Sequence, residues 1–369
     1  MKIIYNLAAL LSALFVSCAE DGAIGDLDAQ RNGTVTVCLA AGSDLVTRGT
    51  HLISSDNRQH AQYVHLYVFD KTGLCVQSKN VNWTQGMGST AKQSYVVSGL
   101  AQDEKYTLLA VGLDEDPTVA GTTYGLPDAI TLNTTPLAGL KAVLAEGKSQ
   151  SDIAGSELFS GWEDVTAGTT LGVTIRLYRR VAGILAYVKD IPAEAATLRV
   201  DLYKNQYKDA PLQKADKSNT YDTNDHGQTE LENSRTIVSI AVSDAAKNAT
   251  TVTDGQGYAI TKQAGTVLQG AYILPVEAPA SANTYTLTLE TLKADGTVLQ
   301  TYPVKMLSKT EAGGSTTETL LTNYPLYANQ FYSIGKKNAT TDEPVSLGED
   351  LVITVDPMWE GISDPIPLE

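Results

Sequence analysis

"LGVTIRLYRRVAGILAYVKDI", residues 171–191, is the stretch that decides the fold of this chain. Its β-branched and aromatic residues alternate with a period of two, which indicates strand rather than helix. The run is too long for one ordinary strand, since strands usually contain about 3–10 residues. We therefore divide it near Arg179 and Arg180, so that "VTIRLY" closes one sandwich and "AGILAYVKDI" opens the next.

Alternating runs of the same kind lie on both sides of this stretch, with turn clusters between them. They are residues 63–70, 93–100, 105–113, 197–205, 235–243, 283–292, 298–307, 330–337 and 350–359. Asp295-Gly296 between two of these runs is a strong hairpin signal. Residues 136–152 are expected to form a short helix, and the polar stretches 208–232 and 308–318 long surface loops. The pattern predicts an all-β protein with two transthyretin-like or Greek-key β-sandwich domains in tandem.

The composition is that of an acidic, globular chain. Its 369 residues suffice for about two domains, at roughly 100–200 residues per domain. A hydrophobic content of 43% supports folded cores, and a charged content of 19% is too low for a disordered chain. The net charge of −15 repels phosphate backbones and anionic membrane surfaces, which excludes nucleic acid as a partner.

The first residues have the pattern of an export signal. Lys2 precedes an apolar run, residues 3–17, which is shorter than the ~20 residues that a membrane-spanning helix needs. The run ends in "ALFVSC", which resembles the lipobox of bacterial lipoproteins, although Phe15 stands where that motif prefers Leu. Residues 1–17 are thus expected to be a lipoprotein signal peptide and Cys18 the lipidated residue. An ordinary secretory signal is the alternative.

No catalytic or ligand-binding constellation accompanies these strands. The four histidines are scattered, and neither a metalloprotease motif, a nucleophile elbow nor a phosphate-binding loop occurs. Residues 222–233 resemble a calcium loop, but His226 stands in place of an oxygen ligand and Asn233 in place of the bidentate Glu. We therefore expect no enzyme activity, no cofactor and no metal site. Cys38 and Cys75 are expected to stay unlinked.

The strand nearest the start, within "NGTVTVCLAAGSDLVTRG" (residues 32–49), carries the functional signal. Val35, Val37 and Leu39 share one face, and Arg48 follows beside Gly49. Together with the lipoprotein signal and "AQYVHLYVFDKTGLCVQS", this order resembles the fimbrillin family, the FimA-type fimbrial subunits of Bacteroidota. The far end, residues 329–362, looks like that family's terminal block. The stretch 206–232 matches no pattern of the family, and its function is open.

The resemblance implies a mechanism of assembly. The precursor would reach the outer membrane through its lipid, and an Arg-specific protease would cut after Arg48. Residues 18–48 would then be a propeptide with a removable first strand, followed by sandwiches over 49–180 and 181–369. Arg31 and Arg58 are competing cleavage positions, although a cut at Arg31 would leave the strand attached.

A strand from a neighbouring subunit would fill the vacated place. The candidate donor lies near residues 350–359, where Leu351, Ile353 and Val355 repeat the spacing of the removable strand. The resemblance thus implies a cell-surface fimbrial subunit that polymerises with copies of itself or with related subunits, contributes to adhesion and contacts a host or bacterial ligand. The alternatives are an anchor or tip subunit that keeps its lipid, or a lipoprotein that binds glycans through Trp83, Trp162 and Tyr124.

Overall fold

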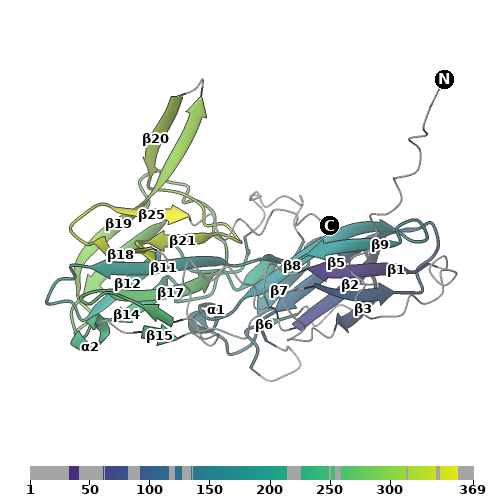
Figure 1. Cartoon of the computed structure of the whole chain (residues 1–369), viewed down its shortest axis with the longest axis horizontal. Coiled ribbons are helices and arrows are strands. Elements are labelled where there is room, and N and C mark those ends of the chain that lie inside the picture. Colours follow the sequence, from purple (N-terminus) through teal and green to yellow (C-terminus); the bar gives the residue numbers. More distant parts are fainter. Residues whose placement is uncertain are drawn as a thin grey trace, which may run out of the picture.

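The computed structural model describes residues 33–40, 61, 63–81, 92–115, 121–126, 134, 136–213, 226–248, 251–253, 259–312, 315–337 and 341–355. Over these residues the chain forms strands and two single-turn helices, α1 (Gln150–Ile153) and α2 (Asp244–Lys247). The strands gather into two lobes that lie along the long axis of the molecule (Figure 1). The predicted all-β sandwich architecture is confirmed.

The N-terminal lobe packs a three-stranded sheet against a five-stranded sheet. The smaller sheet has the order β4 (Lys92–Val97), β1 (Val35–Ala40), β9 (Gly172–Arg176). The larger has the order β10 (Tyr178–Arg179), β8 (Leu158–Thr166), β5 (Lys105–Leu113), β2 (Tyr63–Asp70), β3 (Cys75–Val81). Apolar side chains from the facing surfaces of both sheets form the core of this lobe.

The C-terminal lobe is built on one ten-stranded sheet. Eight strands follow in the order β14 (Thr236–Ala241), β12 (Thr197–Leu202), β18 (Leu287–Leu292), β19 (Val298–Ala312), β25 (Leu351–Val355), β21 (Phe331–Ile334), β11 (Ala182–Lys189), β17 (Val267–Ile273). Two more strands, β20 (Ser315–Leu321) and β24 (Val345–Ser346), pair with β19 and β11. Two small hairpins complete the lobe: β15 (Thr251–Thr253) with β16 (Ala259–Thr261), and β22 (Lys336–Lys337) with β23 (Asp342–Glu343).

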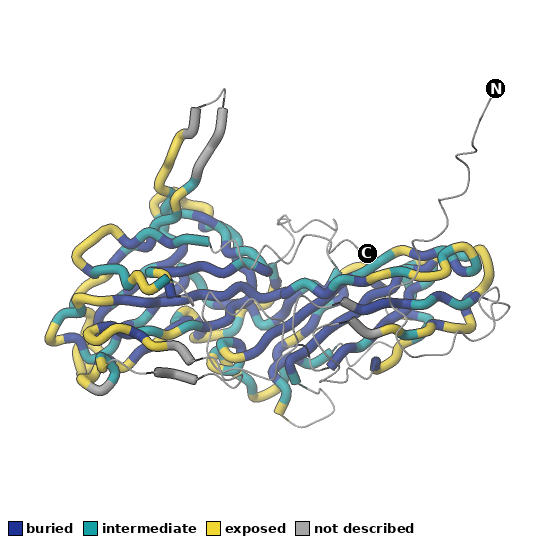
Figure 2. Tube along the Cα trace, in the orientation of Figure 1, coloured by how far each residue is buried: buried dark blue, intermediate teal, exposed yellow. Residues whose placement is uncertain are grey.

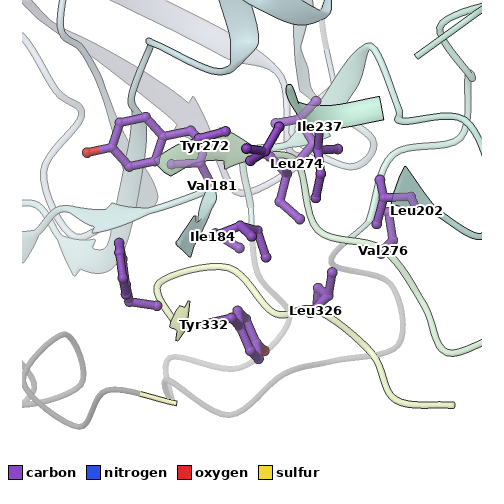
Figure 3. Packing of buried hydrophobic residues seen from close by; sticks show 14 of the residues in the cluster. Val181, Ile184, Leu202, Ile237, Tyr272, Leu274, Val276, Leu326 and Tyr332 are labelled. Atoms are coloured by element: carbon purple, nitrogen blue, oxygen red, sulfur yellow. The ribbon is translucent and has the colours of Figure 1, made fainter. Parts of the chain in front are cut away.

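A continuous apolar core joins the two lobes. The five-stranded sheet is buried on both faces: Val64 and Leu66 of β2 lie on the face toward β1, and Tyr67 and Phe69 lie on the face away from β1. That face belongs to the same cluster as the C-terminal core, part of which Figure 3 shows around Ile184. The uninterrupted dark-blue trace in Figure 2 follows this shared interior from one lobe into the other.

The stretch 171–191 contributes to three sheets. β9 belongs to the three-stranded sheet, β10 pairs with β8 in the five-stranded sheet, and β11 lies in the ten-stranded sheet. The crossing from β9 to β10 runs tightly over β8, where a Cβ on Gly161 would lie 1.8 Å from the carbonyl oxygen of Arg176. A glycine is therefore required at that crossing.

The expected helix over residues 136–152 was wrong. Residues 141–144 form strand β7 (Lys141–Leu144), and only the single turn α1 follows. β7 is the middle strand of a small sheet with the order β13 (Asp209–Pro211), β7, β6 (Tyr124–Gly125). This tertiary pairing overrides the helix propensity of "LAGLKAVL".

The two expected surface loops also differ from the structure. Residues 308–312 and 315–318 belong to the β19–β20 hairpin, which projects from the C-terminal lobe (Figure 1). In the described part of 208–232, Asp209, Ala210 and Leu212 are buried because β13 pairs with β7. The hairpin expected at Asp295-Gly296 is confirmed, with the Lys293 N–H donating to Thr297 O at 2.9 Å.

Candidate strand-exchange site

β1 lies in the middle of the three-stranded sheet. It pairs antiparallel with β4 from Val35↔Val97 to Ala40↔Lys92, and parallel with β9 from Thr36↔Gly172 to Ala40↔Arg176. Both edges of its backbone are thus hydrogen-bonded, which is the arrangement of an interior strand. The strand that the sequence singled out is the one strand that holds β4 and β9 in the same sheet.

The apolar face of β1 points into the core of the N-terminal lobe. Val35, Val37 and Leu39 are completely buried there, in the same cluster as Leu108 and Ile175. Burying a side chain of this size contributes about 1.5–3 kcal/mol. The three residues predicted for the removable strand therefore share one face and one core.

The entry to β1 is fixed by Gly33. Its φ of 66° lies in the left-handed region, and a Cβ at this position would lie 1.8 Å from Leu100 O. The Leu100 N–H donates to Gly33 O at 3.0 Å, which ties the start of the strand to the segment after β4. The residues predicted for lipidation and cleavage, Cys18 and Arg48 with Gly49, lie outside the described residues, as do Arg31 and Arg58.

The candidate donor β25 is also an interior strand. It pairs parallel with β19 from Val304↔Leu351 to Met306↔Ile353 and antiparallel with β21 from Tyr332↔Val355 to Ile334↔Ile353. Leu351 and Ile353 are buried in the C-terminal core, and Val355 packs against it half-buried. Of the predicted donor segment 350–359, residues 356–359 lie outside the described part.

Removal of β1 would vacate a place that another strand could occupy. Loss of β1 would leave rows of unpaired N–H and C=O groups on β4 and β9, on either side of an open apolar core. An incoming strand with apolar residues at alternate positions could restore both ladders and refill the core. The site thus comprises the place occupied by β1 together with its two flanking strands. Sequence reasoning found the strand itself but not β4 and β9 as its walls.

A buried polar cluster, which the sequence did not reveal, joins the end of β5 to the start of β8. Asp114 accepts hydrogen bonds from Ser156 Oγ and the Glu157 N–H, each at 2.8 Å. The Glu157 carboxylate accepts in turn from Arg179 Nε on β10, and both side chains are buried. Burial raises the pKa of Asp114 to about 7, and the nearby charge of Glu157 acts in the same direction.

The other described residues that the sequence singled out take part in packing. Tyr124, expected in a loop, is buried in β6 within the shared core, while Trp162 of β8 packs half-buried against it. Cys38 and Cys75 are buried on two different sheets, and neither forms a disulfide. Among the described residues, no three His, Cys, Asp or Glu side chains are grouped so that they could hold a metal ion. Within the same ranges, no helix has the length and apolarity to cross a membrane.

A family of fimbrial proteins matches this chain. The family model described as fimbrillin-A associated anchor proteins Mfa1 and Mfa2 matches residues 54–254, just over half of the chain. No curated protein matches the sequence.

Solved structures with similar folds include three fimbrial proteins. A fimbrial assembly protein from Parabacteroides distasonis has 15% identity over 88% of this chain and 98% of its own, with a TM-score of 0.39. The tip fimbrial protein Mfa3 from Porphyromonas gingivalis, solved with a C-terminal truncation, has 12% identity over 87% and 98%, with a TM-score of 0.42. The fimbrial anchor protein Mfa2 from the same organism has 12% identity over 79% and 100%, with a TM-score of 0.39.

Proposed function

This chain belongs to the family of fimbrillin-A associated anchor proteins Mfa1 and Mfa2, and from that premise we propose that it is a structural subunit of a cell-surface fimbrium. In this proposal the subunit is exported as a lipoprotein, cleaved after Arg48 and polymerised by strand exchange, and it contributes to adhesion. The observation that carries the proposal is the interior position of β1 between β4 and β9.

Cleavage turns this position into an acceptor site. Arg48 follows β1 in the sequence, so a cut there separates the strand from everything that folds after it. The walls of the place, β4 and β9, remain in the mature chain. Val35, Val37 and Leu39 leave together, and their loss opens the core along the length of the vacated strand.

β25 of a neighbouring copy is the proposed replacement. Leu351, Ile353 and Val355 have the two-residue spacing that matches Val35, Val37 and Leu39. Leu351 and Ile353 are already buried, so their transfer exchanges one apolar environment for another and loses little hydrophobic free energy. The remaining cost is the opening of the ladders to β19 and β21. Because each contact is head-to-tail and does not close, the product is a filament.

Mass spectrometry of the N-terminus of purified surface material tests this function. We expect the mature chain to begin at Gly49, and Arg48→Ala to yield a lipidated monomer that begins at Cys18. Arg58→Ala is the matched control and should leave the terminus and the polymer unchanged. Polymers that form at wild-type levels from Arg48→Ala would contradict the proposal.

A fimbrial anchor is the second candidate, favoured by the family description itself. An anchor keeps its lipid and its first strand, so β1 would stay in place as the structure describes it. The same measurement separates the two: wild-type surface material that begins at a diacylated Cys18, with no chain beginning at Gly49, identifies an anchor. Cys18→Ala should abolish surface display in either case.

A further inference from the structure

The chain between β21 and β25 is fastened to β11. We call residues 341–347 the clamp segment, which contains β23 and β24. β24 pairs parallel with the end of β11, where Lys189 lies opposite Ser346. The Leu347 N–H donates to Lys189 O at 3.4 Å, and the Leu347 side chain is buried in the C-terminal core. The clamp segment is therefore an integral part of the C-terminal lobe.

Asp342 holds the clamp segment to three other parts of the lobe. Its carboxylate accepts a hydrogen bond from the hydroxyl of Tyr187 on β11 and forms an ion pair with Lys337 Nζ on β22 at 3.1 Å. Its backbone oxygen accepts from Gln263 Nε2, in the segment before β17, at 3.0 Å. Hydrogen bonds to a charged group are the stronger ones, so Asp342 is the main polar attachment of the clamp segment.

Gly335 lets the backbone of the clamp segment lie directly against β11. Its φ is 77°, and a Cβ at this position would lie 2.2 Å from Tyr187 O and 3.1 Å from Val345 N. The exit of β21, the end of β11 and the start of β24 thus meet with no space for a side chain between them.

The turn between the clamp segment and β25 is held much less firmly. Gly348, Glu349 and Asp350 are all exposed, and the Glu349 N–H donates only locally, to Ser346 O at 3.1 Å. Asp350 pairs with Lys305 Nζ on β19 at 3.1 Å, but its side chain is 71% exposed, and exposed ion pairs contribute little to stability. This turn is therefore a place at which the chain can bend.

The clamp segment and the proposed donor pair with different strands. β24 pairs with β11, whereas β25 lies between β19 and β21. Opening both ladders of β25 therefore breaks neither the pairing of β24 nor the contacts of Asp342. We propose that residues 341–347 stay docked on β11 when β25 leaves, and that the donor departs at the turn 348–350. This inference rests on the proposed strand exchange, and it names Asp342 as the residue that positions the point of departure.

The docked clamp segment keeps the joint between subunits short. Three extended residues span at most about 10 Å, so the turn 348–350 would place the acceptor site of the neighbour close to the clamp segment. Departure at Gly335 instead would put all of residues 336–350 between the two subunits. A short connection allows the donor little freedom before it binds, which lowers the entropic cost of insertion.

Two disulfide locks in the full-length chain, expressed on intact cells, test the inference. The first lock, Lys189→Cys with Ser346→Cys, ties β24 to β11, and the matched lock, Lys305→Cys with Val352→Cys, ties β25 to β19. Residues opposite each other on neighbouring strands are about 5 Å apart, within the range of a disulfide. We expect the first chain to form surface multimers at the wild-type yield, with the engineered disulfide intact within them. The second should form multimers only when a reductant is present during assembly.

The outcomes separate the clamp segment from the function on which it rests. If the first chain forms multimers only with reductant, the clamp segment has to leave β11, and the inference is overturned while strand exchange stands. Multimers from the oxidised second chain would show that β25 stays in place, which overturns the proposed donor itself. Hydrogen exchange needs no substitution: the Leu347 amide should exchange equally slowly in the precursor and in the fibre, and faster exchange in the fibre would also overturn the inference.

The role of Asp342 has its own test. Asp342→Ala should accelerate exchange of the Leu347 amide several-fold in the precursor and broaden the subunit repeat of the fibre in electron micrographs. Glu343→Ala, at the exposed neighbouring residue, is the control and should change neither measurement. A fibre of Asp342→Ala with the wild-type repeat and unchanged exchange would show that Asp342 does not position the donor.

Discussion

At the scale of single residues, the buried carboxyl of Asp114 makes the stability of the chain depend on pH. Its pKa rises from 3.8 to about 7 because burial disfavours the charged form, and the charges of Glu157 and Glu115 add to the rise. The unfolded chain therefore loses this proton at lower pH than the folded chain does. Stability falls between about pH 4 and pH 7 and stays lower above, by a total on the order of 4 kcal/mol.

Asp114→Asn removes this charge while keeping a polar side chain for Ser156 and the Glu157 N–H. We expect the variant to be more stable than the parent at pH 8 and to show a flatter dependence on pH, as measured by urea unfolding from pH 5 to pH 8. Asp295→Asn, at an exposed hairpin turn, is the control. A variant that is destabilised equally at pH 5 and pH 8 would contradict this account.

A substitution at Leu39 should lower the stability of the precursor but not that of the proposed mature subunit. Truncation of a fully buried leucine costs about 2–5 kcal/mol, so Leu39→Ala should lower the free energy of unfolding of the uncleaved chain by that amount. The proposed cleavage would remove this residue, so the assembled material should melt as the wild type does. Leu108→Ala lies in the same core but on β5, and it should weaken both forms.

At the scale of secondary structure elements, β25 is an interior strand of its own lobe as well as the proposed donor. A chain truncated after residue 349 loses an interior strand together with Leu351 and Ile353. We expect its C-terminal lobe to unfold at a distinctly lower temperature and to bind a hydrophobic dye. A chain truncated after Val355 keeps the strand and should melt close to the full-length protein, as differential scanning calorimetry would show.

The same two truncations locate the donor. If residues 351–355 supply it, the chain truncated after Val355 still extends filaments, and its failure to do so would move the donor into residues 356–369.

The individual strands were predictable, while their partners were not. Alternation at residues 63–70 and 105–113 correctly indicated β2 and β5, because period two is a local property of the sequence. Residues 141–144 were wrongly assigned to a helix because alanine, leucine and lysine favour helix locally. In the structure, pairing with β13 and β6 makes these residues a strand. Strand order is set by contacts far apart in sequence. For that reason the apolar face of β1 was evident, whereas its place between β4 and β9 was not.

At the scale of the whole molecule, the proposed acceptor site and the proposed donor lie in different lobes of one continuous structure. An Arg48→Ala chain keeps β1 in its own acceptor site but retains β25. It should therefore add to a neighbour and then block the next addition. Co-expressed with the wild type, it should shorten filaments in proportion to its share, as electron microscopy would measure.

An Arg48→Ala chain that also ends after residue 349 lacks the donor as well, and it is the control that should leave filament length unchanged. Filaments of normal length in the presence of the single variant would show that an occupied acceptor site does not end growth.

The two ladders on either side of β1 have a mechanical consequence. A strand that takes its place is bonded along both edges, antiparallel to β4 and parallel to β9. Tension applied along the fibre pulls such a strand lengthwise, so the bonds of both ladders bear the load together in shear instead of opening one at a time. A fimbrium joined in this way would hold a cell against flowing fluid without a covalent link between its subunits.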